Sequence, residues 1–457
     1  MMKRKIARII TILFVTLLLA ACAGDAQPAY YPEVDEGHAV TDEIYEPEHV
    51  LDEYDEEPEP IVANYPELPG KIAVIVDQWL FESWNEHRIA WLVELQERYG
   101  QNNMLVFGWP SRNRGFTADE TEAMIHEIAA NDEIGVLIVH SAQYGTDHII
   151  SILRESRDDI FVVYLNYSLR EWWDEDPPFR DNTLAEAAVN ANLILGFDDN
   201  EWLMNFPAMA HNLGATTLVY FYNSVSWDWD EDAGYHVMIT YERPEPCPCI
   251  LCELASIYGL EIVAADTEDY IQCGSSYHMF MVRTIPPILE EHGHDIVLFG
   301  LDNERAFWQW LGDGFIYLPM QPGAGWFDLY PARLALELRI FDDNPRVEVE
   351  IEYDVPQLIE MIRQNVEERG MTGRIATPPI SLNMLFPLAA AEYGVMWMQG
   401  EVPQDSGIDM QVLQHIMVDI IAEHTGLQNH GVNLALLEED GVTYENYILV
   451  LLEHIVY

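Results

Sequence analysis

Polar side chains follow nearly every apolar run that the sequence predicts to be a buried strand. In the stretch DIVLFGLDNERAFWQW (295–310), the apolar run closes on Asp302 and Asn303 before a helical pattern begins. Amides, carboxylates and hydroxyls in such positions can hydrogen-bond a small polar molecule, and aromatic rings beside them can cover its flat apolar faces. We expect ten residues of this kind to contact a ligand: Gln78, Trp79, Ser141, Gln143, Asn166, Tyr167, Asn223, Asp302, Asn303 and Gln321.

Each of these side chains also has a structural interpretation. A polar residue at the end of a strand can cap the helix that follows it. The aromatic residues near the strand ends, which include Tyr144, Trp227 and Trp326, also fit ordinary packing. Capping and ligand binding remain open for any single position, but the recurrence of the pattern along the chain favours a shared site.

Apolar strands alternate with amphipathic helices from residue 71 onward, a pattern that predicts parallel sheets built from strand–helix–strand units. The first series of strands is predicted at 71–77, 103–108, 135–141, 160–166 and 192–198, and the second at 216–224, 260–266, 295–302 and 314–320. The predicted fold class is α/β, with two doubly wound parallel-sheet lobes joined by a hinge. Ligands of open parallel sheets bind outside the carboxyl ends of the strands, so the polar ends of both lobes are expected to face one crevice.

The first 22 residues are predicted to be a lipoprotein signal peptide. Four basic residues precede a short apolar run (9–20), and Leu19-Ala20-Ala21-Cys22 resembles a bacterial lipobox, in which the cysteine is lipidated. An ordinary secretory signal with a chance cysteine is the alternative. If the lipobox is used, Cys22 is the first residue of the exported chain and its membrane anchor.

Four further segments are predicted after the signal. Residues 23–69 are rich in Asp, Glu and Pro and lack apolar periodicity, which indicates a disordered tether. The first lobe is placed at 70–198 and the second at 199–325. Residues 326–457 carry helical patterns, such as 355–369, and are expected to pack back on both lobes.

The charge of the chain argues against nucleic acid as a partner. The formal net charge is -56, and Lys71 is the single lysine after the predicted signal. Binding to a phosphodiester backbone depends on Lys and Arg side chains that neutralise phosphates, and this chain has few of them.

Four cysteines besides Cys22 leave their chemistry open. Cys247, Cys249 and Cys252 lie close together in PCPCILCELA, and Cys273 follows. An export signal favours disulfides or thiols, but four thiolates could also hold a metal, although the spacing lacks paired C-x-x-C knuckles. A redox role is the weakest of the three interpretations, and the pairing does not follow from the sequence.

Three stretches resemble known protein families. The segment FDDNEWLMNFPAMAHNLGATTLVYFYN (197–223) resembles the lobe junction of type 1 periplasmic binding proteins, where an Asp-rich turn after the fifth strand opens a helix that leads into the second lobe. IYLPMQPGAGWFDLYPARLALEL (316–338) and TGRIATPPISLNMLFPLAAAEYG (372–394) are similar to signature stretches of a family of bacterial lipoproteins described as a domain of unknown function. The resemblance covers about 71 to past 394 and implies a type 1 binding-protein-like fold. It implies no ligand, so it assigns no functional residue.

These features together favour a lipid-anchored extracytoplasmic solute-binding protein. We expect it to capture a small polar molecule, similar to a sugar or a nucleoside, for an ABC transporter permease or a sensor, with the membrane contacted through the N-terminal lipid. No catalytic residue, cofactor or metal is predicted, because the sequence holds no nucleophile elbow, phosphate-binding loop or dinucleotide-binding loop. The alternatives are a surface-anchored hydrolase that uses the same crevice and a structural lipoprotein that binds no ligand.

Overall fold

The computed structural model describes most of the chain after residue 64. The described residues are 65–77, 90–109, 118–140, 146–166, 183–222, 225–230, 235–240, 249–266, 277–299, 316, 318, 334, 338, 355–404 and 407–457. The predicted signal peptide, its Cys22 and nearly all of the predicted tether lie outside these residues.

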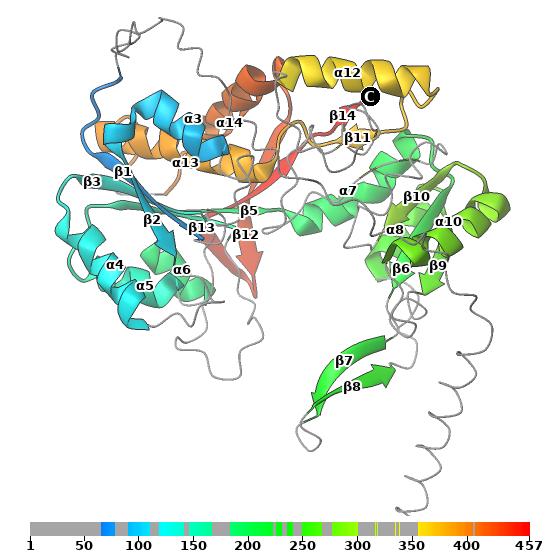
Figure 1. Cartoon of the computed structure of the whole chain (residues 1–457), viewed down its shortest axis with the longest axis horizontal. Helices are drawn as coiled ribbons and strands as arrows, with labels where there is room; N and C mark the ends of the chain where they lie inside the picture. Colours follow the sequence, from blue (N-terminus) through cyan, green and yellow to red (C-terminus); the bar gives the residue numbers. More distant parts are fainter. Residues whose placement is uncertain are drawn as a thin grey trace, which may run out of the picture. The chain divides into compact units, whose positions relative to one another are not determined.

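Strands and helices alternate through most of the described chain (Figure 1). The strands are β1 (Lys71–Asp77), β2 (Met104–Trp109), β3 (Ile134–Val139), β4 (Phe161–Leu165), β5 (Leu193–Phe197), β6 (Thr217–Tyr222), β7 (Val225–Asp230), β8 (Tyr235–Thr240), β9 (Glu261–Asp266), β10 (Ile296–Phe299), β11 (Ala376–Thr377), β12 (Val432–Glu439), β13 (Val442–Leu452) and β14 (Ile455–Val456). The helices are α3 (Ala90–Tyr99), the short 3-10 helix η2 (Gln101–Asn103), α4 (Ala118–Ala130), α5 (Thr146–Arg154), α6 (Leu184–Asn190), α7 (Asp199–Asn212), α8 (Cys249–Ile257), α10 (Tyr277–His292), α12 (Val355–Glu368), α13 (Leu382–Gln399) and α14 (Met410–Thr425).

The larger sheet has seven strands in the order β12-β13-β5-β4-β3-β1-β2. Strands β1 to β5 pair in parallel, and β13 joins them in parallel beside β5. Such strands are apolar on both faces because helices cover both sides of the sheet. Alternate residues of β1 show this: Ile72 and Val74 belong to one apolar core, and Ala73 and Ile75 belong to another.

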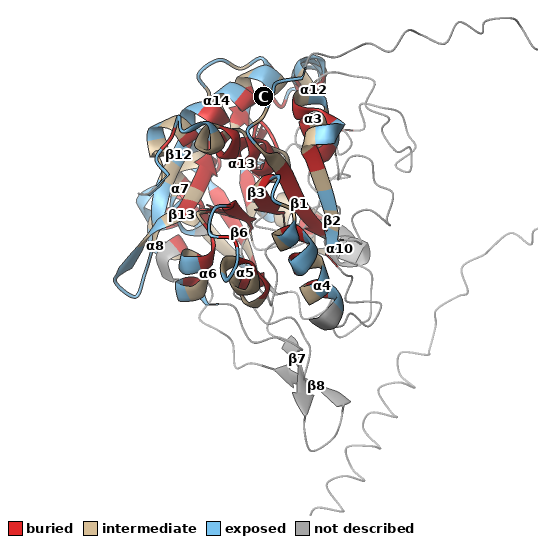
Figure 2. Ribbon diagram, turned by 90° about the vertical axis from the view of Figure 1, so that its left-hand side faces the viewer, coloured by how far each residue is buried: buried red, intermediate tan, exposed pale blue. Residues whose placement is uncertain are grey.

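Helices cover both faces of this first sheet, as a doubly wound fold requires. Helix α13 packs against β3, β4, α3 and α14 on one face, and α4, α5 and α6 pack against one another on the other face (Figure 1). Figure 2 shows that buried residues concentrate in the strands, and α13 is buried along most of its length. The approach of α13 to the sheet is close: a Cβ atom at Gly394 would lie 2.9 Å from the Val136 methyl groups.

The C-terminal hairpin of β12 and β13 extends the first sheet. The two strands pair antiparallel, and β13 then lies beside β5, more than 240 positions earlier in the chain. The sequence pattern predicted helices after residue 326, and α12, α13 and α14 agree with it, but it missed this hairpin. Beyond it, β14 pairs antiparallel with the short strand β11.

A second parallel sheet has the strand order β10-β6-β9. Ile316 makes an isolated parallel bridge to Val297 of β10, within the predicted strand 314–320. The predicted α/β fold class with parallel sheets is therefore confirmed, and the predicted domain boundaries remain predictions. Among the described residues, no helix combines the length and the apolar character that a membrane span would require.

Candidate ligand-binding site at the carboxyl edge of the first sheet

Asn166 is the one predicted ligand contact that lies among the described residues. The other nine lie outside them, so their roles remain predictions: Gln78, Trp79, Ser141, Gln143, Tyr167, Asn223, Asp302, Asn303 and Gln321. The site is therefore built below from Asn166 and from the described residues that surround the same edge of the sheet.

Asn166 directly follows β4 and has a left-handed backbone with φ 54°. Its backbone N–H donates to the carbonyl of Leu195 at 3.0 Å, which keeps the residue attached to β5. Strand alternation would direct its side chain toward the face that holds Val162 and Tyr164. Instead, its Nδ2 donates to Oδ1 of Asn383 on α13 at 3.2 Å, so the left-handed turn brings the amide to the opposite face. Non-glycine residues adopt this conformation uncommonly, and Asn tolerates it better than most.

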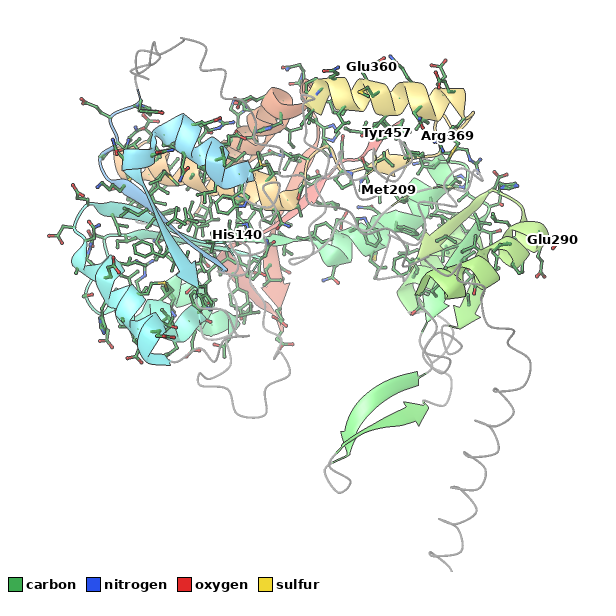
Figure 3. The ribbon with its side chains drawn as sticks, viewed as in Figure 1. His140, Met209, Glu290, Glu360, Arg369 and Tyr457 are labelled. Atoms are coloured by element: carbon green, nitrogen blue, oxygen red, sulfur yellow. The ribbon has the colours of Figure 1, made fainter. Side chains whose placement is uncertain are left out.

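His140 directly follows β3, the strand next to β4. Its backbone N–H donates to the carbonyl of Ile75 at 2.9 Å, which continues the pairing of β3 with β1. Its position in the alternation matches that of Val136 and Ile138, which face α13. The imidazole lies flat against the indole of Trp91 on α3, with ring centroids 4.5 Å apart and planes 6° apart. Figure 3 shows His140 among the packed side chains of the first sheet.

The imidazole of His140 is buried with its hydrogen-bonding capacity unused. Its residue is 6% exposed, and neither ring nitrogen has a hydrogen-bond partner within the described part of the chain. Burial lowers the pKa of His140 to about 4, because charging the ring would cost solvation, and an interaction with the backbone of Asn383 opposes this only in part. The ring is neutral near pH 7, with one donor and one acceptor nitrogen.

The N-terminus of α13 belongs to the same edge of the sheet. Ser381 is its N-cap, and its hydroxyl accepts from the backbone N–H of Asn383 at 3.2 Å. Asn383 is the residue that both Asn166 and His140 approach. The start of an 18-residue helix carries a partial positive charge, which favours oxygen atoms as ligands, while the N–H groups of Asn383, Met384 and Leu385 already bond Ser381.

Capping, the other interpretation of polar residues at strand ends, holds at Asp198. This residue follows β5, and its Oδ1 accepts from the backbone N–H of Glu201 at 2.9 Å in the first turn of α7. The helix that opens here is the one expected at the lobe junction. Asp198 therefore serves the fold, whereas His140 has no comparable structural partner within the described residues.

A second unused donor is found on α7. Trp202 is 2% exposed, and its indole N–H has no hydrogen-bond partner among the described residues. The indole packs against Phe206, with centroids 5.0 Å apart, and against Phe299 at the end of β10, with centroids 5.8 Å apart. Tyr220 of β6 also stacks on Phe299. An aromatic cluster with one unused N–H thus lies beside the end of a strand of the second sheet.

The sequence pattern predicted neither His140 nor Trp202 as a site residue. His140 lies one residue before the predicted contact Ser141, in the stretch GVLIVHS. A titratable ring at the end of a buried apolar strand was the available signal, because such a ring loses hydration unless a partner replaces it. Trp202 gave no comparable signal, since tryptophans on amphipathic helices usually pack in cores.

Metal binding gains no support from the described residues. They contain no group of three or more His, Cys, Asp and Glu side chains in an arrangement that could hold an ion. Cys249 and Cys252 lie on α8, whereas Cys247 and Cys273 lie outside the described residues, so the chemistry of the cysteines stays open. The described edge of the first sheet instead offers side-chain amides and an imidazole, which suit hydrogen bonding to an uncharged polar molecule.

The sheets and helices define a mixed α/β protein with parallel sheets. The chain belongs to a family: residues 71–376 match the family described as "Protein of unknown function (DUF3798)". The sequence matches no curated protein.

Three solved structures are similar to this chain at low sequence identity. A proposed transcriptional regulator from Clostridium difficile 630 is 15% identical, with a TM-score of 0.60, and the match covers 86% of this chain and 100% of that one. A sugar ABC transporter from Actinomyces odontolyticus ATCC 17982 is 12% identical, with a TM-score of 0.40 and coverage of 76% and 88%. A carbohydrate transporter from Acidothermus cellulolyticus 11B in complex with myo-inositol is 10% identical, with a TM-score of 0.33 and coverage of 79% and 100%. The first of these supports the fold alone.

Proposed function

We propose that this protein is a lipid-anchored extracytoplasmic solute-binding protein. It captures a small polar molecule, similar to a sugar or a nucleoside, between two lobes and presents it to a transporter or sensor in the membrane. The observation that carries the proposal is His140: a neutral imidazole, 6% exposed and without a hydrogen-bond partner among the described residues, at the edge where parallel sheets bind their ligands.

The neighbours of His140 support binding at this edge. The side-chain amides of Asn166, at the end of β4, and Asn383, at the start of α13, bond each other. Each amide retains further donors and acceptors. A left-handed asparagine costs conformational energy, and such strain is found preferentially at functional sites. The Trp91 ring fixes the plane of the imidazole, so the polar atoms are held in place before a ligand arrives.

Binding is favoured over catalysis by the kind of groups present. A general acid or base works best with a pKa near the working pH, whereas burial holds the pKa of His140 at about 4. A neutral imidazole stacked on an indole is suited to recognition. The net charge of -56 argues against nucleic acid as a partner.

Ligand binding is tested by thermal shift and calorimetry of the exported chain against neutral sugars, cyclitols, nucleosides and related metabolites. We expect at least one compound class to raise the unfolding temperature and to bind with one-to-one stoichiometry. Chromatography of the mixture after incubation shows whether the compound is returned unchanged, as binding requires. The absence of any binder would refute the proposal, and turnover of a bound compound would replace it with the hydrolase alternative.

Lipid anchoring is tested separately through Cys22. We expect the native chain to fractionate with membranes and to incorporate labelled fatty acid in its bacterial host, and the Cys22→Ala chain to lose both properties. Membrane association that survives Cys22→Ala would contradict anchoring at this residue.

A further inference from the structure

The chemistry around His140 indicates which group of a ligand it recognises. This inference rests on the proposed ligand-binding function and narrows it to one subsite. His140 is enclosed by Trp91 of α3 on one ring face and lies near the backbone of Asn383 on α13. No charged side chain among the described residues contributes to the pKa of the imidazole, so no ion pair compensates a charge there.

A charged ligand group fits this environment poorly. A carboxylate or phosphate oxygen only accepts hydrogen bonds, so it would use the N–H of the ring and would favour protonation of the other nitrogen, which burial opposes. An ammonium group only donates, and its charge would be buried without a partner. Both arrangements carry a desolvation cost. The start of α13 would offset part of this cost for an anion, but no charged side chain among the described residues acts on the imidazole to offset the rest.

A hydroxyl group fits both ring nitrogens. It donates to the bare nitrogen or accepts from the N–H nitrogen, so it suits either tautomer of the neutral ring. The flat stack on Trp91 covers one ring face, and both nitrogens lie on the ring edge, buried and without a hydrogen-bond partner among the described residues. The adjacent amides of Asn166 and Asn383, which bond each other at 3.2 Å, can both donate and accept as well.

We propose that His140 forms a subsite for an uncharged alcohol hydroxyl of the ligand, with the amides of Asn166 and Asn383 beside it. The ligand is accordingly a hydroxylated small molecule that carries no charge on the part that meets the edge of β3 and β4. Trp91 and the start of α13 hold the imidazole in position for this contact.

The subsite is tested with matched sets of compounds. Calorimetry would compare pentoses, hexoses and cyclitols with their acid and amine derivatives, for example glucose with gluconate and glucosamine, between about pH 5.5 and pH 8. We expect a neutral member to bind best, with an affinity that stays constant across this range because the imidazole does not titrate there. Preference for a charged member, or an affinity that rises as the pH falls, would overturn the subsite while leaving solute binding intact.

Two substitutions separate recognition from folding. His140→Phe keeps a flat ring against Trp91 but removes both nitrogens, and we expect it to weaken binding of the best neutral compound by about 10-fold to 100-fold. His140→Gln keeps one donor group and one acceptor, and we expect it to lose less affinity than His140→Phe. Because a buried unpaired polar group destabilises a protein, the unfolding temperature of His140→Phe should equal or exceed that of the native chain.

The outcomes distinguish this inference from the broader proposal. A stable His140→Phe chain with unchanged affinity would exclude His140 from the site, although the protein would still bind solutes. Failure of every compound to bind the native chain would instead refute the proposed function and this subsite with it.

Discussion

The two edges of the first sheet use buried polar side chains in opposite ways. At the amino edge, Arg157 is 8% exposed and makes hydrogen bonds from all three guanidinium nitrogens. At the carboxyl edge, His140 is 6% exposed and makes none within the described residues. The same sheet therefore has a fully satisfied cation at one edge and an unsatisfied neutral ring at the other.

The amino-edge contacts explain how the strands begin. Arg157 donates to the carbonyls of Asn131 and Ile134 at 2.9 Å each and forms a bidentate pair with Asp159. Arg154 donates to the carbonyl of Ile160 at 2.8 Å and to Oδ1 of Asn192 at 2.6 Å. These arginines join the turns before β3, β4 and β5, so their role is structural. The contrast teaches that burial alone does not mark a site; burial with unused hydrogen-bonding capacity does.

Removal of the Arg157 guanidinium should have the largest effect on stability. Arg157→Met would remove the guanidinium donor from the buried carbonyl of Ile134 and the partner of Asp159, so we expect the free energy of unfolding to fall by about 3 kcal/mol in urea denaturation. Arg363→Met is the matched control, because this arginine on α12 has a 44% exposed side chain and lies 4.0 Å from Glu360. We expect the free energy of unfolding of this control to fall by less than about 0.5 kcal/mol. Equal effects of the two substitutions would contradict the structural role of the amino edge.

The buried imidazole should make stability depend on pH. The unfolded chain binds a proton at His140 near pH 6.5, whereas the folded chain does so only near pH 4, so protonation favours unfolding as the pH falls between these values. Between about pH 7 and pH 5 we expect this protonation to lower the free energy of unfolding of the native chain by about 2 kcal/mol. His140→Phe should lack this contribution. The many carboxylates titrate in both chains, so the difference between their two stability curves is the quantity to measure. Parallel curves would show that His140 is not buried in its neutral form.

Substitutions of Asn166 should separate backbone conformation from hydrogen bonding. Asn166→Gly and Asn166→Ala both remove the amide that bonds Asn383, but only glycine adopts φ 54° without a steric penalty. We therefore expect Asn166→Ala to be less stable than Asn166→Gly by about 1 kcal/mol in urea denaturation. Equal stability of the two variants would argue against a left-handed turn at the end of β4.

The ion pairs around Glu94 should contribute least to stability, because solvent partly reaches them. Glu94 of α3 pairs with Arg98 and with His424 of α14, whose Nε2 lies 3.0 Å from Glu94 Oε1. Burial acts to raise the pKa of Glu94, but His424 and Arg98 outweigh it and hold the value below its ordinary range. The stability that this adds is present above about pH 4.5 and is lost as the pH falls further.

A double-mutant cycle measures this pair directly. With Glu94→Gln and His424→Gln, we expect a coupling of about 0.5 kcal/mol at neutral pH, well below the effect of Arg157→Met. A coupling energy as large as the loss expected for Arg157→Met would mean that partial exposure does not weaken these contacts. It would remove the distinction between the buried and the partly exposed networks.

Local sequence signals predicted much of the fold. Apolar runs bounded by polar residues placed β1 to β6, β9 and β10 within a few residues, because parallel strands buried on both faces need continuous apolar side chains. The β12–β13 hairpin was missed because its place beside β5 depends on pairing between distant parts of the chain. No local pattern encodes such a contact.

The candidate site was less accessible to prediction than the fold. Asn166 was identified because Asn at the end of a strand is a recognisable polar signal, although its contact with Asn383 depends on how α13 packs. His140 was missed because its importance lies in the absence of hydrogen bonds in the folded protein, which a sequence does not display. All ten ligand contacts predicted from the sequence, Asn166 included, remain predictions.

Hydrogen–deuterium exchange, measured with and without the best-binding neutral hydroxylated compound, tests the central claim most directly. We expect the compound to protect backbone amides that follow β3 and β4 and those at the start of α13, which include His140, Asn166 and Asn383. The turns held by Arg154 and Arg157 should exchange at the same rate in both samples. Protection confined to those turns, or to elements away from the carboxyl edge, would contradict the account.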